Sequence, residues 1–191
     1  RKRGSKITNM NSVTSLKEEL KRQKNEELLE AVSEGNVKVA AKLLQSGAEL
    51  DNSMNKNGCR PLHIAAHNAD TEMLQCLLSF KPDLEVQTNL LKLTPLHCAV
   101  SSKSLDCVQI LLDAGADFEA QTDAGERPLH LALMRAEPDL VKLLVVHGAN
   151  RHAPCPCIWD SKVAKSTVEL AKEIPGNVAD QMLMLLTMPV K

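Results

Sequence analysis

Two histidines in one short segment have the spacing of a zinc site. His63 and His67 are four residues apart, so on a helix both imidazoles would lie on one face, as they do in zinc proteases. Those enzymes place a glutamate directly after the first histidine as general base, and Ile64 stands there instead. We favour a structural role for His63, because His97 and His130 occur in the same Pro-Leu-His tripeptide without a second histidine.

A second candidate set combines histidines and cysteines near the C-terminus. Imidazole and thiolate groups are zinc ligands, and the set consists of His147, His152, Cys155 and Cys157. Pro154 and Pro156 interrupt it and favour an extended recognition or spacer loop. A small enzyme that used either set would contain bound metal, which elemental analysis of the purified protein would detect.

The rest of the sequence offers little further chemistry. Free cysteine usually packs as a small buried apolar group, and we expect this role for Cys76, Cys98 and Cys107, whereas Cys59 falls on a loop. The chain contains no Gly-rich phosphate-binding motif, no G-x-S-x-G turn and no carboxylate pair that spacing alone would single out. We therefore expect a protein that is not an enzyme and needs no metal or cofactor.

Leucine and alanine dominate the elements that must position these residues. The chain has 191 residues, of which 43% are hydrophobic, with 29 leucines, 19 alanines and only three aromatic residues. Strong helix formers favour an all-α core, whereas a β-sandwich or a base-stacking surface needs residue types that are scarce here. No uncharged apolar run approaches the roughly 18 residues that span a membrane. Because the chain begins with Arg1 and has no apolar signal segment, we expect a fragment of a cytoplasmic or nuclear protein.

Charge is divided unevenly along the chain. Residues 1–24 contain eight Lys or Arg and two Glu, a balance of +6, so the remaining residues contain 15 basic and 22 acidic groups, a balance of −7. Phosphate binding needs clustered positive charge, so we expect no nucleic acid on this acidic body, whose charge would instead favour a basic partner. The basic residues 1–3 are interpreted as a solvated flank, with a nuclear-import segment as the alternative.

An internal repeat decides the fold. Pro-Leu-His occurs at residues 61–63, 95–97 and 128–130, with histidine spacings of 34 and 33. Turn tripeptides follow each histidine after 18 residues, and leucine pairs recur between the markers. Proline suits the first turn of a helix and glycine suits the residue after its end. Each unit is then a helix-turn-helix that is too small to bury its own apolar face, so neighbouring units must stack.

These residues strongly resemble the ankyrin repeat, whose pattern is roughly Gly-x-Thr-Pro-Leu-His-x-Ala-Ala followed later by Leu-Leu-x-x-Gly-Ala-Asp. The resemblance implies an all-α ankyrin-repeat solenoid of about five stacked helix-turn-helix units with an N-terminal helical extension. We place a basic flank and helix at 1–25 and the repeat domain at 26–187. Within it we expect repeats at about 26–54, 55–88, 89–121 and 122–151, an enlarged loop at 151–165 and a degenerate C-terminal cap at 165–187. Ser15 and Glu18 form a capping box that predicts a helix start there, and we expect this N-terminal helix to lie against the first repeat.

Several positions depart from the family pattern. Arg60 and Arg127 replace the threonine before the proline, whereas Thr94 matches, so we expect less secure loop order in two repeats. Lys92 replaces a loop-tip glycine, where a left-handed backbone would cost about 1 kcal/mol.

The resemblance also implies where a partner binds. The family uses a concave face, made of projecting loops and first helices, to bind other proteins. Three leucines at one loop tip have no core to serve, and exposed apolar clusters usually mark contacts; as an alternative, Leu93 packs inward and only Leu90 and Leu91 are exposed. The matching partner-binding positions are Leu90, Leu91, Leu93, Lys56, Asn57, His67, Asn68, Ser101, Ser102, Asp123, Glu126, Met134 and Arg135, with Trp159 of the enlarged loop as an alternative contact.

The sequence thus predicts a non-enzymatic protein–protein interaction module, a scaffold or adaptor that binds a partner protein or peptide on its concave face. The alternative is a regulatory or substrate-recruiting ankyrin domain of a larger enzyme assembly, such as a ubiquitin ligase or a kinase. We expect no membrane insertion, and the sequence leaves the oligomeric state open.

Overall fold

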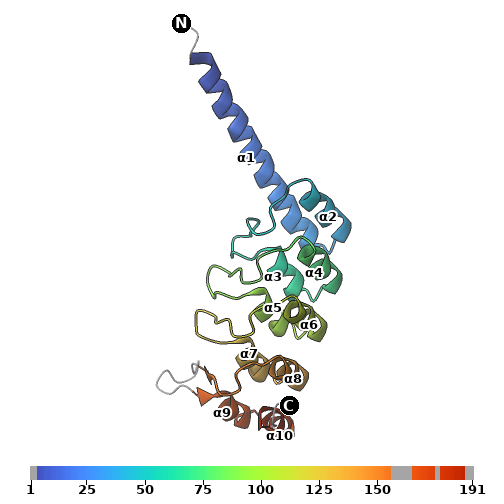
Figure 1. Cartoon of the computed structure of the whole chain (residues 1–191), viewed down its shortest axis with the longest axis vertical. Helices are drawn as coiled ribbons and strands as arrows, with labels where there is room; N and C mark the ends of the chain where they lie inside the picture. Colours follow the sequence, from blue (N-terminus) through green and yellow to red (C-terminus); the bar gives the residue numbers. More distant parts are fainter. Residues whose placement is uncertain (1–3, 156–164, 175–176, 188–191) are drawn as a thin grey trace.

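The chain forms a stack of helix pairs with a long helix projecting from one end (Figure 1). The computed structural model describes residues 4–155, 165–174 and 177–187. Within these residues the helices and strands are α1 (Gly4–Ser33), α2 (Val37–Gln45), α3 (Pro61–His67), α4 (Thr71–Leu78), α5 (Pro95–Ser101), α6 (Leu105–Asp113), α7 (Pro128–Met134), α8 (Pro138–Val146), β1 (Pro154–Cys155), β2 (Lys165–Ser166), α9 (Thr167–Lys172) and α10 (Asn177–Thr187).

Local signals begin and end these helices as the sequence predicts. The three Pro-Leu-His prolines are the first residues of α3, α5 and α7. The outer helices α2, α4 and α6 begin with side-chain caps; in α4, Asp70 accepts from the backbone N–H of Met73 at 2.9 Å. Helix α8 has no side-chain cap and begins with Pro138. Gly115 and Gly148 follow α6 and α8 with φ of 95° and 100°, a conformation that glycine adopts without a steric penalty.

The core runs continuously through the stack, between the inner helices α3, α5 and α7 and the outer helices α4, α6 and α8. Each pair contributes fully buried leucines, namely Leu62, Leu77, Leu96, Leu111, Leu129 and Leu144. At the N-terminal end Val39 is 43% exposed, whereas Met73 and Cys107, one and two repeats later, are completely buried. Burial of each outer helix therefore depends on the repeat that precedes it.

The first helix corrects one expectation. Helix α1 begins at Gly4 rather than at Ser15. Figure 1 shows its N-terminal part extending away from the stack, while its C-terminal part lies against α2, as expected. Neither proline nor glycine occurs between Gly4 and Gly35, so nothing interrupts the helix at the Ser15 capping box. Side chains from Ser15 to Gln23 are exposed, and burial starts at Leu28.

Polar contacts hold the C-terminal part of α1 against the first repeat. Lys24 donates to the carbonyl oxygen of Ser46 at 2.7 Å, and Lys21 forms an ion pair with Glu49 at 2.5 Å. None of the helices in the described part of the chain is long and apolar enough to cross a membrane.

The last pair, α9 and α10, follows a small hairpin. Strands β1 and β2 pair antiparallel, with Pro154 opposite Ser166. Glu169 stands where the earlier repeats have histidine, and its carboxylate accepts from the backbone N–H of Ser166 at 2.7 Å. The degenerate unit thus retains the helix-starting contact of the other repeats with a different side chain.

Candidate functional site

The three repeated histidines join successive repeats. Each imidazole Nε2 donates to a carbonyl oxygen of the following loop: His63 to Leu93 at 2.9 Å, His97 to Glu126 at 3.3 Å and His130 to Ala153 at 3.4 Å. Each Nδ1 accepts from the backbone N–H three residues earlier, at 3.0–3.2 Å. Both ring nitrogens are therefore occupied by protein groups, as the structural interpretation of His63 requires.

Burial keeps these imidazoles neutral. It lowers the pKa of His63 below its ordinary value, and it lowers the pKa of His97 and of His130 to about 4. His67 ends α3 with its side chain exposed. Among the residues that the structure describes, no three His, Cys, Asp or Glu side chains gather as a metal ion would need. Cys157, which belongs to the second candidate set, lies outside the described residues.

The cysteines pack as small apolar groups in the middle repeats. Cys98 and Cys107 are buried, and burial raises the pKa of both thiols, that of Cys98 to about 12. Cys76 is only partly buried, although burial raises its thiol pKa as well. These thiols are therefore protonated at neutral pH and are weak nucleophiles.

The two arginines that replace threonine correct a second expectation, because both make contacts that hold their loops. Arg60 donates from Nε to the carbonyl oxygen of Asp51 at 2.7 Å and from Nη1 to that of Gln87 at 2.9 Å. Arg127 pairs through Nε with Oε2 of Glu119 at 2.9 Å. A planar guanidinium offers several donors, so Arg60 links its own loop to the next one, whereas Arg127 forms its ion pair within its own loop.

The projecting loops form a continuous row, which we call the loop-tip row. The backbone N–H of Asn89 donates to the carbonyl of Asn57 at 3.1 Å, and that of Asp123 donates to the carbonyl of Leu91 at 3.0 Å. Figure 1 shows these loops on the side of α3, α5 and α7 that faces away from the outer helices. We define the row by the two tip residues of each loop: Lys56, Asn57, Leu90, Leu91, Asp123 and Ala124.

Backbone conformation at the loop tips follows the sequence. Lys92 has φ of 52°, the left-handed conformation expected at this glycine position. Gly58, its equivalent, has φ of 76° and lies directly against Asn89, so that a Cβ at Gly58 would be 2.7 Å from the backbone nitrogen of Asn89. Glycine is required at this tip both for its conformation and for the close approach of the next loop.

The middle tip is apolar and exposed, with one exception among its leucines. Leu90 and Leu91 are 77% and 60% exposed. Leu93 is partly buried and packs against the core, so its assignment to an exposed cluster is wrong. The structure thus agrees with the alternative, in which Leu93 packs inward and only Leu90 and Leu91 are exposed.

The ends of the inner helices supply the rest of the predicted surface. The exposed residues are His67, Asn68, Met134 and Arg135, and Ser101 is half-buried. Ser102 is engaged structurally, since its hydroxyl donates to the carbonyl of Ala66 at 2.8 Å. Glu126 is also partly withdrawn: burial raises the pKa of its carboxyl, and among the described residues its Oε1 has no hydrogen-bond partner. Trp159 lies outside the described residues.

A row of acidic side chains along the turns was not anticipated. The carboxylates accept from a backbone N–H one repeat later: Asp51 from Asp83 at 3.3 Å, Glu85 from Asp117 at 2.8 Å and Glu119 from Asn150 at 2.7 Å. Their spacing of 34 residues in the sequence was the available signal. Burial raises the pKa of the Glu85 carboxyl, and the neighbouring Asp117 and Asp83 charges add to this effect. These three carboxylates therefore lie along the turns and not at the loop tips.

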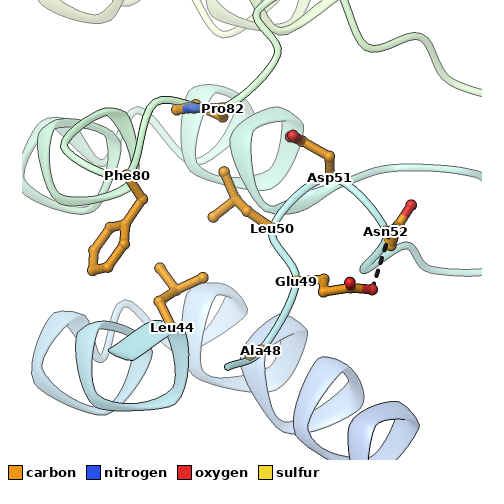
Figure 2. Close-up of a pocket in the computed structure, with 8 residues that line it drawn as sticks. All are labelled: Leu44, Ala48, Glu49, Leu50, Asp51, Asn52, Phe80 and Pro82. Carbon is orange, nitrogen blue, oxygen red and sulfur yellow. Dashed lines mark hydrogen bonds between the residues drawn. The ribbon is translucent and has the colours of Figure 1, made fainter. Parts of the chain in front are cut away.

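A hollow of about 320 Å³ lies beside these turns, between the first two helix pairs (Figure 2). Figure 2 shows Phe80 over Leu44 and Leu50, with Glu49 hydrogen-bonded to Asn52 on the opposite side. Glu49 is also paired with Lys21. The polar groups of this hollow thus already serve the structure, and we assign no ligand to it.

Comparison with known families places the repeats. A family model described as "Ankyrin repeats (3 copies)" matches residues 28–122, and one described as "Ankyrin repeat" matches residues 124–155. A comparison with curated proteins gave no match.

Proposed function

Because the chain belongs to the ankyrin-repeat family, we propose that it is a scaffold or adaptor that binds a partner protein or peptide on its concave face. Ankyrin repeats generally mediate protein–protein interactions, and the family is typically non-catalytic. The concave face here consists of the loop-tip row and the ends of the inner helices. We further propose that the protein acts in the cytoplasm or the nucleus.

The observation that carries this proposal is the exposure of Leu90 and Leu91. Both belong to a loop whose backbone is hydrogen-bonded to the loops on either side, so their exposure does not come from a loose tip. A contiguous apolar pair on a rigid support is suited to anchor a partner, and burying the two side chains would contribute about 1.5–3 kcal/mol each.

Polar residues surround this anchor. Lys56, Asn57 and Asp123 flank it within the loop-tip row, while His67, Asn68 and Arg135 lie on the inner helices. Apolar anchors inside a polar rim are the usual arrangement of binding hot spots. The body balance of −7 should speed the encounter with a basic partner and make the association rate fall as salt rises.

Affinity capture with matched variants tests the proposal. The bait chains are the wild type, Leu90→Asp/Leu91→Asp, Val146→Asp and Trp159→Ala, each checked for helicity by circular dichroism. Val146 is 69% exposed on α8, so its variant adds a charge on the opposite side. We expect proteins captured by the wild type and Val146→Asp to be lost from the leucine variant. Capture that survives in the leucine variant and fails in Trp159→Ala would move the site to the enlarged loop.

A further inference from the structure

The loop-tip row changes charge along the stack. Lys56, Leu90 and Asp123 occupy the same position in three successive loops, with sequence spacings of 34 and 33. The row therefore begins with a cation at repeat two, is apolar at repeat three and ends with an anion at repeat four. All three side chains are exposed.

The two terminal charges are available to a partner. Within the described ranges, neither Lys56 nor Asp123 takes part in an ion pair, whereas Lys103 is paired with Glu137 and Arg127 with Glu119. Lys92 adds a second exposed cation beside the leucines. Glu126, the next acidic residue after Asp123 in the sequence, is partly buried.

The row also holds these charges at a defined separation. Hydrogen bonds between adjacent loops fix the tips relative to one another, and packed helices lie about 8–10 Å apart. Two repeats thus separate Lys56 from Asp123 by roughly 16–20 Å. An extended peptide advances about 3.3 Å per residue, so about five or six residues would cover this distance.

From this pattern we propose the partner's chemistry: an extended segment with an acidic residue, an apolar centre and a basic residue. Its acidic end lies over Lys56, its apolar centre on Leu90 and Leu91, and its basic end over Asp123. This inference rests on the proposed function and specifies the ligand of the same face. A uniformly basic segment would be attracted by the acidic body, yet it would place like charges beside Lys56 and Lys92, which is unfavourable.

Peptide selection provides a direct test. Random phage-displayed peptides of roughly twelve residues, longer than the predicted span, are panned against the whole chain. The consensus peptide and a twin with its acidic and basic residues exchanged are then titrated calorimetrically. The protein variants are the exchange Lys56→Asp/Asp123→Lys, the outer-helix exchange Lys142→Asp/Asp106→Lys as a control, and Leu90→Asp/Leu91→Asp.

We expect the selected peptides to carry opposite charges on either side of apolar residues. The wild type and the outer-helix control should bind the consensus about three- to tenfold tighter than its twin, as expected for two exposed charge pairs. The loop-tip exchange should reverse this preference, and the leucine variant should lose binding of both peptides.

Two results would count against the inference in different ways. Peptides that lose binding to the leucine variant but bind the loop-tip exchange variant with an unchanged preference would overturn the proposed charge order. The proposed function would still stand. Peptides that bind equally well to the leucine variant, or a selection that yields no binder, would contradict the proposed function as well.

Discussion

The Nε2 atom of His97 lies 3.3 Å from the carbonyl oxygen of Glu126, so a buried imidazole of one repeat donates to the loop of the next. His63 and His130 make the same contact. Because Nδ1 of each ring accepts a backbone N–H, protonation of the ring would break one contact. Three equivalent positions therefore respond to acid in the same direction.

Stability should fall as the pH is lowered from about 6.5 to about 4. An unfolded histidine binds its proton near pH 6.5, whereas the folded chain delays protonation of His97 and His130 until their pKa of about 4. Between these values the unfolded state holds more protons, so acid favours unfolding. Urea titrations of the wild type and His97→Gln should show the variant less stable at pH 7 by about 1–3 kcal/mol. The difference should shrink toward pH 4; a difference independent of pH would contradict this assignment.

Truncation of a buried leucine should destabilise the stack, as the family architecture requires. Leu133→Ala removes a completely buried side chain and should lower the free energy of unfolding by about 2–5 kcal/mol. Leu111→Ala should act alike, while His67→Ala and Asn68→Ala, at exposed positions, should change it little. Denaturant titration measures all four variants, and equal losses at His67 and Leu111 would disprove the predicted core.

Alanine at Gly58 should cost more than alanine at Gly47. Both glycines have positive φ, but a Cβ at Gly58 would also meet Oδ1 of Asn89 at 2.3 Å, while Gly47 faces open space. Gly47→Ala then measures the backbone strain alone, about 1 kcal/mol. A similar melting temperature for the two variants would show that the loop of Gly58 is not in close contact with that of Asn89.

The last helix pair should act as a cap. Met182 and Leu186 of α10 are buried against the core, and Met184 is 58% exposed. Deletion of residues 165–191 should expose the apolar face of α7 and α8, with loss of solubility or a lower melting temperature. Met182→Asp should weaken the chain in the same way and Met184→Asp should not. A monodisperse deletion variant of unchanged stability would rule out a fifth stacked unit.

The repeating part of the fold was predictable because its signals are local. A proline at the start of each inner helix, a histidine two residues later and a turn tripeptide recur in the sequence itself. The structure confirms the all-α ankyrin stack that they indicate. Exposure of Leu90 and Leu91 followed from the same reasoning, since a tip residue has nothing above it to pack against.

The features that sequence reasoning missed depend on contacts between distant residues. Ser102 looks like a free surface serine, but Ala66, 36 residues earlier, supplies the carbonyl that binds it. The sequence suggests that Arg60 weakens its loop, but in the structure its guanidinium donates to the carbonyl oxygens of Asp51 and Gln87. The Ser15 capping box failed for another reason: a cap acts only where the preceding residues leave the helix, and those residues are helical here.

The bonds from the histidines give the stack a direction. Each imidazole Nε2 binds the loop of the following repeat, whereas its Nδ1 accepts from the backbone at the start of its own inner helix. Loss of one imidazole should therefore loosen the loop of the following repeat and leave that of the preceding repeat ordered. In His97→Gln, hydrogen exchange should speed up in the loop of Glu126 before it does in the loop of Asn57. The same asymmetry should affect a peptide that spans the loop tips. Its contacts with the loop of repeat four should depend on the histidine of repeat three, whereas its contacts with repeat three should depend less on repeat four.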